Sequence, residues 1–531
     1  MNLPNHSGER VSLRHWAAVF GSMLGAFMAV LDIQITNASL KDILGSLGAT
    51  LDEGSWVSTS YLVAEIVVIP LTGWLAEVFS PRRYLLGTTA AFLTASAACA
   101  WAWNLDSLIV FRVIQGFTGG AMIPLALALV LQLLPPRHHP LGFAVFGMTA
   151  TFAPAVGPSI GGWLTENYGW PWIFYLNLFP GAIMLAALAW GMDRAPARLE
   201  KFRHCDWAGV LTVATGLGCL ITLLEEGNRH DWFRSREMVA LGVAAAASLA
   251  AGVWIELRVR DPFINLRLLA RPAFAFPSVV GAVFGLGMYG VMYLLPVYLA
   301  EIQGYHSGQI GRTIMWSGVP QLLLMPVAAV LAKHIDGRRL VAAGLLFFAA
   351  SCFINARLTH LTAHDQLRLT QVIRAIGMPL VIVPLTSLAT RGLTVAETGS
   401  ASSLFNMLRN LGGSVGIALL ATRLDTGEAV HRARLSESVS IYQNATLERM
   451  AALTGRFTLS GADPATATAR GLSVLNHTLR RESRIAAYRD AFGVLGWVLV
   501  ATVPLALLPG RGRRGGGGDL IDEGALRGMW D

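Results

Sequence analysis

Runs of predominantly apolar residues recur along the whole chain, and they restrict its possible folds more than any other feature. A helix that crosses a bilayer needs about 20 such residues, because the hydrocarbon interior offers the backbone no outside hydrogen-bond partners. Fourteen spans are predicted, at residues 15–38, 54–75, 84–103, 107–134, 139–163, 171–191, 206–224, 236–255, 272–299, 307–333, 339–357, 366–390, 399–422 and 487–509. The expected fold class is therefore an all-α polytopic membrane protein.

Composition and the distribution of basic residues agree with this expectation. Hydrophobic residues make up 54% of the chain and charged residues only 14%, whereas soluble domains carry about 25% charged residues. Basic residues are concentrated in alternate short loops, among them Arg82, Arg83, Arg194, Arg258, Arg338 and Arg339. Because such loops stay on the cytoplasmic side, both termini are predicted to be cytoplasmic. The net charge of +8 then reflects orientation in the bilayer, and no nucleic-acid partner is expected.

Among the charged residues within the predicted spans, we single out Asp32, Glu65, Arg112, Arg374 and Arg409. Each costs at least about 2.5–3.5 kcal/mol on insertion scales, so each needs an explanation. Glu65 has no neighbour in sequence that pairs with it, and desolvation favours the neutral form of a carboxyl group. We therefore predict that Glu65, and next Asp32, takes up and releases protons. The alternative for both acids is a structural hydrogen bond to another helix.

Arg112 is predicted to act with these acids rather than to carry protons itself, because arginine stays charged. It can shift the protonation of an acid or hold a substrate anion. The glycines that follow it, at positions 116, 119 and 120, let a neighbouring helix approach closely. The alternative is an arginine that braces helices through backbone carbonyl groups.

The fifth span has small residues at helical spacing, including Ala153, Gly157 and Gly161, which gives a smooth face for close packing. Pro154 and Pro158 remove backbone donors and bend the helix. A bent helix with a small face suits a mobile seam between two helical bundles, and a static packing seam is the alternative.

Two inner loops share a pattern in which an acid precedes paired arginines. The first contains Gly73, Glu77, Arg82 and Arg83, and the second contains Asp336, Arg338 and Arg339. Arg112 and Arg374 also occupy matching spans if the seventh and eighth helices are an insertion. This weak internal repeat is typical of transporters built from two related six-helix halves.

These motifs together resemble the major facilitator superfamily and, within it, the fourteen-span drug:proton antiporters (EmrB/QacA-like). The resemblance rests on Leu31–Leu40 for the first span, Gly73–Arg83 for the loop between the second and third, Arg112–Gly120 for the proton-coupling motif, and Ala153–Gly162 for the antiporter motif. The second half of the chain matches more loosely. The chain departs from the usual pattern at Gln34, Lys41, Glu77, Val78 and Ser80.

The resemblance implies two six-helix bundles that rock about a central cavity. The N-terminal bundle is expected at residues 1–200, an inserted two-helix hairpin at 201–260, and the C-terminal bundle at 261–510. The last includes a long extracytoplasmic loop, 423–486, within which Leu447–Leu453 reads as an amphipathic helix. The tail, 511–531, contains a glycine run and is expected to be disordered.

The resemblance also implies proton-driven export of small hydrophobic or amphipathic compounds by alternating access. Its proton-coupling residues would be Asp32, Glu65 and Arg112, and its gating residues Gly73, Glu77, Arg82, Arg83, Gly157, Pro158, Gly161, Asp336 and Arg338. Substrate contacts are predicted for Asn37, Gln115, Met148, Phe152, Tyr289, Tyr293 and Met407, since aromatic and flexible side chains tolerate varied ligands. Plain packing is the alternative for the apolar ones.

The expected location is the bacterial cytoplasmic (inner) membrane, with the lipid bilayer and small-molecule substrates as partners. A periplasmic membrane fusion protein and an outer-membrane channel are further possible partners, and the segment 423–486 is a place for such contact. No cofactor or metal is expected, because the energy source is the proton gradient. Two rival functions stay open: a dedicated exporter of one metabolite such as a siderophore or an antibiotic, and a membrane enzyme or lipid scramblase. The second lacks support, since the sequence has no nucleophile motif in a suitable context, no metal-ligand set and no phosphate loop.

Overall fold

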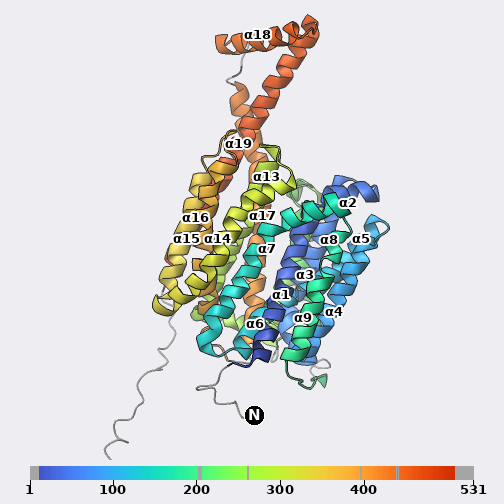
Figure 1. Ribbon diagram of the computed structural model, residues 1–531, viewed down its shortest axis with the longest axis vertical. Helices are drawn as coiled ribbons and strands as arrows, with labels where there is room; N and C mark the ends of the chain where they lie inside the picture. The colour runs from blue at the N-terminus through green and yellow to red at the C-terminus, as the bar shows by residue number, and fades with distance from the viewer. Residues whose placement is uncertain are drawn as a thin grey trace, which may run out of the picture.

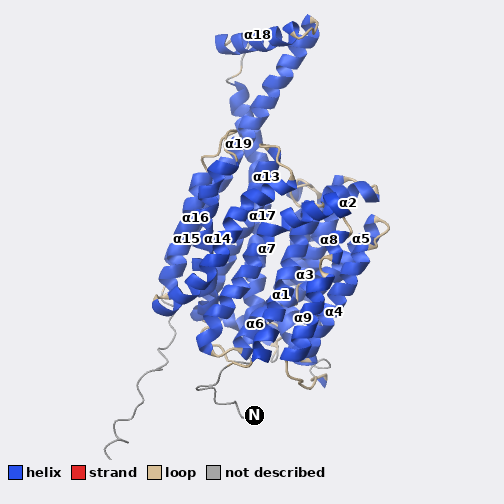
Figure 2. Ribbon diagram, viewed as in Figure 1, coloured by secondary structure: helices blue, strands red, loops and turns tan. Residues whose placement is uncertain are grey.

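The computed structural model describes residues 11–200, 206–259, 262–394, 397–437, 439 and 442–508. Within these ranges every regular element is a helix (Figure 2), which confirms the all-α fold class. The predicted disordered tail, 511–531, lies outside the described residues, as do the first residues of the N-terminal bundle and both edges of the inserted hairpin.

The first group of helices forms one bundle, on the right in Figure 1. Helix α1 contacts α6, α7 and α9, while α5 packs between α3 and α4. Helix α3 begins with a capping box in which Thr50 and Glu53 bond each other's backbone groups. The bounds are α1 Leu13–Ala38, α2 Leu40–Leu47, α3 Leu51–Phe79, α4 Pro81–Ala100, α5 Leu105–Gly119, α6 Met122–Leu133, η1 Pro136–His138, α7 His139–Tyr168, α8 Trp172–Tyr175 and α9 Leu178–Gly191.

Two helices, α11 (Trp207–Glu226) and α12 (Arg236–Arg258), follow as an antiparallel pair joined through η2 (Trp232–Arg234). Helix α11 also contacts α3 of the first bundle and α17 of the second. Thr59 of α3 donates a hydrogen bond of 2.8 Å to Glu226 at the end of α11. The pair therefore lies beside the bundles and touches both.

The second bundle, on the left in Figure 1, is built around α13, which contacts α16, α17 and α19, and around the α15–α16 and α14–α16 contacts. The bounds are η3 Leu266–Ala270, α13 Pro272–Glu301, α14 Ser307–His334, α15 Gly337–Asn355, α16 His364–Ala389, α17 Thr398–Glu437, α18 Asn444–Leu459 and α19 Pro464–Leu507.

The segment 423–486, expected to be a long extracytoplasmic loop that contains an amphipathic helix, is mostly helical in its described part. Helix α17 has 40 residues and α19 has 44, so at about 1.5 Å per residue both are roughly twice as long as the hydrocarbon core is thick. They project beyond the bundle, with α18 across their tip (Figure 1). Helix α18 contains the predicted amphipathic stretch and confirms that it is helical.

Arg484 of α19 stabilises the base of this projection. Its guanidinium group forms ion pairs of 3.0 Å with Glu301 of α13, 2.8 Å with Asp425 and 2.9 Å with Glu428 of α17. A planar guanidinium group is well suited to several carboxylates at once, because its donors point in fixed directions. The two long helices are thereby tied to each other and to the bundle.

Within the described ranges, twelve helices are long and apolar enough to cross a membrane, or thirteen if the segments Pro136–Pro154 and Val156–Tyr168, bent by 45°, form one span. Helix α4 has 20 residues and covers the predicted span 84–103, but it is less apolar than the others. The fourteen predicted spans are compatible with this arrangement.

The two bundles meet along two lines of contact. Helix α7 runs antiparallel to α14, so that Gly147 lies against Met325 and Ser159 lies against Gly311. Helix α17 packs against α3 and α6 near its beginning, where the Ser402 hydroxyl donates a hydrogen bond of 2.7 Å to the Pro124 carbonyl. Any relative movement of the bundles must act on these two contacts.

Candidate functional site

A polar cluster centred on Asp32 lies inside the first bundle. The Asp32 carboxylate accepts hydrogen bonds from Arg112 Nη1, from Gln115 Nε2 at 2.9 Å and from Asn177 Nδ2 at 2.7 Å. Ser96 Oγ accepts from the same two amides, at 3.1 and 2.9 Å. Asp32 is 2% exposed and Arg112 is fully buried. The negative charge is therefore balanced by one cation and held by three donors.

Glycines on α5 place Arg112 within reach of Asp32. A Cβ atom on Gly116 would collide with the Tyr61 carbonyl oxygen, and one on Gly120 would lie 2.7 Å from the Glu65 carbonyl oxygen. Without side chains at these positions α5 lies directly on α3. The guanidinium of Arg112 then lies 4.2 Å from the centroid of the Tyr61 ring, a cation–π contact that helps to stabilise a buried charge.

Glu65 lies nearby on α3 but in a different setting. Its residue is 3% exposed, and no hydrogen bond to its carboxyl group occurs among the described residues. It interacts electrostatically first with Arg409 and then with Arg112 and Asp32. Because α3 belongs to the first bundle and α17, which carries Arg409, to the second, this interaction crosses the boundary between the bundles.

The hydrogen-bonding capacity of the Arg409 guanidinium group is only partly used. The residue is 2% exposed, and its Nε and Nη1 atoms are buried without a hydrogen-bond partner. Its guanidinium lies 5.8 Å from the centroid of the Phe146 ring on α7. A buried cation with open donors and a buried acid thus lie on opposite sides of the boundary between the bundles.

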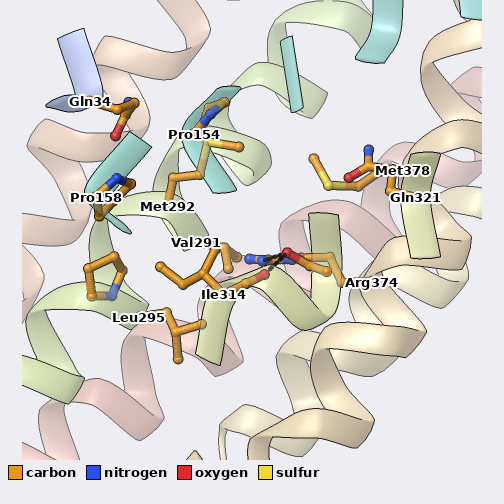
Figure 3. Close-up of a pocket in the computed structure, with 12 residues that line it drawn as sticks. Gln34, Pro154, Pro158, Val291, Met292, Leu295, Ile314, Gln321, Arg374 and Met378 are labelled. Atoms are coloured by element: carbon orange, nitrogen blue, oxygen red, sulfur yellow. Dashed lines mark hydrogen bonds between the residues drawn. The ribbon is translucent and has the colours of Figure 1, made fainter. Parts of the chain in front are cut away.

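A small enclosed cavity lies between the bundles and contains a second arginine, Arg374 of α16 (Figure 3). Its volume of about 30 Å³ holds roughly two water molecules, since one needs about 10–15 Å³ by the same measure. The first bundle contributes α1 and α7 and the second contributes α13, α14 and α16. The lining residues are Gln34, Pro154, Pro158, Val291, Met292, Leu295, Pro296, Ile314, Ser317, Gln321, Arg374 and Met378.

Arg374 donates hydrogen bonds from Nη2 to Ser317 Oγ at 2.8 Å and to Gln371 Oε1 at 2.6 Å. The residue is 5% exposed, and its Nε atom has no partner. No acid forms an ion pair with it among the described residues. The cavity therefore combines a buried positive charge with walls that are largely apolar.

The predicted substrate-contact residues do not line this cavity. Gln115 belongs to the Asp32 cluster, and Asn37 is exposed and accepts a hydrogen bond from Ser58. The remaining five are aromatic or sulfur-containing and wholly or partly buried: Met148, Phe152, Tyr289, Tyr293 and Met407. Phe152 stacks on Phe27 with centroids 6.3 Å apart, and Tyr289 donates a hydrogen bond of 3.4 Å to Asn410. Their roles in substrate contact stay predictions.

Sequence reasoning missed several residues that the fold brings to these sites. Asn177 and Ser96 join the Asp32 cluster, and Ser317 and Gln321 join Arg374 around the cavity. The available signal was a polar side chain inside an apolar run, which all four share. That signal does not say which of them meet.

The predicted gating residues occupy two kinds of place. Gly73 lies at the α3–α17 contact, where a Cβ atom would come within 3.0 Å of the Gly399 carbonyl carbon. Arg82 donates a hydrogen bond of 2.9 Å to the Ala189 carbonyl at the end of α9, while Glu77 and Arg83 are exposed. In the second loop, Asp336 caps α15 by accepting from the backbone N–H of Arg338 at 3.0 Å. The gating roles themselves stay predictions.

The small face of α7 is directed differently from the sequence prediction. A Cβ on Gly157 would lie 2.5 Å from Gln34 Cβ, and one on Gly161 would lie 3.0 Å from the Ile35 carbonyl oxygen. Both contacts are with α1 of the same bundle. The expectation that these glycines form the seam between the bundles is therefore wrong, and it is Pro154 and Pro158 that face the cavity at the boundary.

Comparison with known proteins gives a consistent result over most of the chain. The family model of the Major Facilitator Superfamily matches residues 22–417. The colistin resistance protein EmrB of Acinetobacter baumannii is 32% identical over 502 residues, which cover 94% of this chain and 97% of that protein. The multidrug export protein EmrB of Escherichia coli is 34% identical over 419 residues, covering 78% and 81%.

Two further comparisons concern a relative and a solved structure. The fatty acid resistance protein FarB of Neisseria gonorrhoeae is 31% identical over 495 residues, covering 93% of this chain and 96% of that protein. The crystal structure of the human organic anion transporter MFSD10 aligns with a TM-score of 0.61 at 15% identity, covering 93% of this chain and 99% of that chain. At this identity the second similarity concerns the fold alone.

Proposed function

The chain belongs to the major facilitator superfamily, and from this premise we propose that it exports small hydrophobic or amphipathic molecules in exchange for protons. It is a multi-pass membrane protein of a transporter family rather than an enzyme family. The names of its relatives, which refer to multidrug export and to resistance against colistin and fatty acids, support export as the direction of transport and amphipathic compounds as the cargo.

The observation that carries the proton-coupling proposal is the position of Glu65. It is a buried acid on one bundle, without a hydrogen bond among the described residues, and it interacts electrostatically with buried Arg409 on the other bundle. Protonation removes the negative charge and with it the attraction across the boundary. Because the interaction lies at low dielectric, this change alters the relative free energy of the arrangements that the two bundles adopt.

Asp32 and Arg112 have a supporting part in this proposal. The Asp32 carboxylate accepts hydrogen bonds from three donors, one of them the guanidinium group of Arg112. Arg112 interacts electrostatically with Glu65 as well. Movement of α5 against α1 and α3 would change the charge that Glu65 experiences, which links the two acids.

Orientation and assembly are proposed on the same basis. Both termini lie in the cytoplasm of a bacterium and the projection formed by α17, α18 and α19 faces the periplasm, in agreement with the excess of basic residues in alternate loops. The exposed surface of α18, which has no buried residue, is then available to a membrane fusion protein that leads to an outer-membrane channel.

The test is substrate-driven proton flux in proteoliposomes that contain the purified protein and an internal pH dye. Three fluorescent probes serve as substrates: ethidium as a cation, Nile red as a neutral compound and 8-anilinonaphthalene-1-sulfonate as an anion. We expect at least one of them to elicit proton flux in the wild-type protein, and Glu65→Gln to abolish that flux. Glu53→Gln, at the exposed beginning of the same helix, is the matched control and should behave like wild type. Absence of flux with all three probes contradicts proton-coupled export.

A further inference from the structure

The two bundles contain arginines in matching local environments but with different charge balance. Arg112 donates a hydrogen bond of 2.8 Å to Gln115, three residues later, and Arg374 donates one of 2.6 Å to Gln371, three residues earlier. Arg112 is paired with Asp32. For Arg374 the described residues provide Ser317 Oγ and Gln371 Oε1, and no carboxylate.

An uncompensated cation in this position is costly. A buried charge without a partner loses several kcal/mol of solvation, and evolution usually pairs or removes it. The Nε atom of Arg374 is also buried without a hydrogen-bond partner, as is Nε2 of Gln321, which lines the same cavity and is 3% exposed. The cavity thus presents a positive charge and two open donors, and it lacks the acceptor that would complete them.

The rest of the cavity wall indicates which kind of molecule would supply the missing hydrogen-bond acceptor. Figure 3 shows the Arg374 guanidinium extending between Val291 and Ile314, and Leu295, Met292 and Met378 complete the apolar part of the wall. Methionine side chains adapt to ligands of different shapes. The free volume is that of about two water molecules, which is close to the size of a carboxylate group. A polar head therefore fits the cavity as it stands, whereas the apolar body of a larger molecule needs the bundles to move apart.

Resting on the proposed export function, we infer that the transported substrates carry an acidic group and that Arg374 binds it in this cavity. The donors of Arg374 and Gln321 receive the anionic oxygens, and the apolar part of the substrate lies along the α13 and α16 side chains. In the first bundle Asp32 already supplies this charge, so the substrate acid in the second bundle does what Asp32 does in the first. A cationic head is disfavoured there, because Arg374 repels it at low dielectric.

The position of the cavity connects binding with transport. Gln34, Pro154 and Pro158 come from the first bundle, whereas Ser317, Gln321 and Arg374 come from the second. An acid bound to Arg374 therefore touches both bundles and favours the arrangement in which they close around it. Arg374 is a substrate-binding residue in this account, distinct from the proton-coupling acid Glu65.

Binding of octyl compounds that differ only in their head group tests the inference. Octanoate, 1-octanol and octyltrimethylammonium are titrated at pH 7.4 into the full-length protein in nanodiscs, with acetate as a head group without a tail. We expect octanoate to bind at least about tenfold more tightly than the other two octyl compounds and acetate to bind weakly. In Arg374→Gln the affinity for octanoate should fall to that for 1-octanol, which itself should be unchanged, and Arg374→Lys should retain part of the preference.

Two further variants control for folding and for general charge effects. Arg368→Gln makes the same change on the same helix at a residue whose side chain is 47% exposed and paired with Asp365, and it should bind octanoate like wild type. Ser317→Asp places a carboxylate beside Arg374 and should weaken octanoate binding without removing the arginine. If Arg374→Gln does not fold, Ser317→Asp and Arg374→Lys still decide the question.

Several outcomes overturn the inference: equal affinity for the three octyl compounds, no binding of octanoate, unchanged octanoate affinity in Arg374→Gln, or acetate binding as tightly as octanoate, which marks a site for small inorganic or organic anions only. These outcomes are independent of the proton-flux assay. Flux driven by ethidium or Nile red without an octanoate preference refutes the substrate class and leaves proton-coupled export intact. Octanoate binding that depends on Arg374, with no flux for any probe, refutes proton-coupled export and leaves the binding site intact.

Discussion

The two bundles use a buried arginine in different ways. In the first, Arg112 is paired with Asp32 inside a cluster of polar side chains that the chain itself supplies. In the second, Arg374 has the same neighbouring glutamine contact but no carboxylate among the described residues, and it faces a cavity at the boundary between the bundles. A charge that is balanced internally contributes to structure, whereas a charge left unbalanced beside a cavity is available to a ligand. In our proposal, this difference assigns proton coupling to the first bundle and substrate binding to the second.

Among the variants that test this comparison, Arg112→Gln in the first bundle should have the largest effect on stability. Arg112→Gln leaves the Asp32 carboxylate buried without its cation, and breaking a buried pair in this way costs about 3–5 kcal/mol. Thermal unfolding of the purified protein in one detergent measures the loss. The double variant Arg112→Gln/Asp32→Asn removes both charges and should recover part of it. Wild-type stability of the single variant would mean that Arg112 and Asp32 are not a stabilising pair.

The variant Ser317→Asp should give Arg374 in the second bundle a carboxylate partner, as Asp32 is for Arg112 in the first. In Ser317→Asp the new carboxylate accepts the hydrogen bond that Ser317 Oγ now accepts from Arg374 at 2.8 Å. Hydrogen bonds to charged groups contribute about 1.5–3 kcal/mol, so the unfolding temperature should rise. Ser351→Asp serves as the control, because Ser351 is buried on α15 and its hydroxyl donates to the Phe348 carbonyl of the same helix; there the new charge should destabilise. A loss of stability in Ser317→Asp would show that Arg374 is already balanced.

A third variant tests whether the small face of α7 serves packing within the first bundle or movement at the boundary between the bundles. Gly157→Leu places a large side chain against Gln34, and overpacking of this kind costs about 1–3 kcal/mol. We expect lower stability and normal alternation between the two access states, as judged by cysteine labelling from each side of the membrane. Gly87→Leu, on α4 with nothing within 4 Å of its Cβ position, should be neutral. If the variant were trapped in one access state at normal stability, Gly157 would act at the boundary between the bundles after all.

The smallest effect is expected for Arg374→Gln, which completes the comparison with Arg112→Gln. It removes a buried charge that has no carboxylate partner, so the desolvation cost that disappears offsets the lost hydrogen bonds. The free energy of unfolding should change by less than about 1 kcal/mol, measured under the same conditions as for Arg112→Gln. A loss as large as that of Arg112→Gln would indicate a structural role for Arg374.

Much of the architecture could be predicted from the sequence. Apolar runs predict spanning helices because the bilayer forces the backbone to satisfy its own hydrogen bonds, whatever the neighbouring helices are. The conformation of segment 423–486 is harder to predict, because its mixture of charged and apolar residues is compatible with either a loop or a solvated helix. Its form depends on contacts such as those of Arg484 with Glu301 and Asp425, which lie far apart in sequence.

By itself, the sequence determined the helical fold class and the resemblance to a transporter family. It also identified the charged residues within the apolar spans, each of which needs a partner or a function. Hydropathy along the chain depends only on local composition, and local composition is what decides whether a segment enters the bilayer. The tertiary structure alone decided which charges meet: Asp32 with Arg112 and Asn177, Glu65 with Arg409, and Arg374 with a cavity instead of an acid. The physical reason is that an electrostatic interaction depends on distance and burial in space, and both are set by how helices rotate and pack against one another.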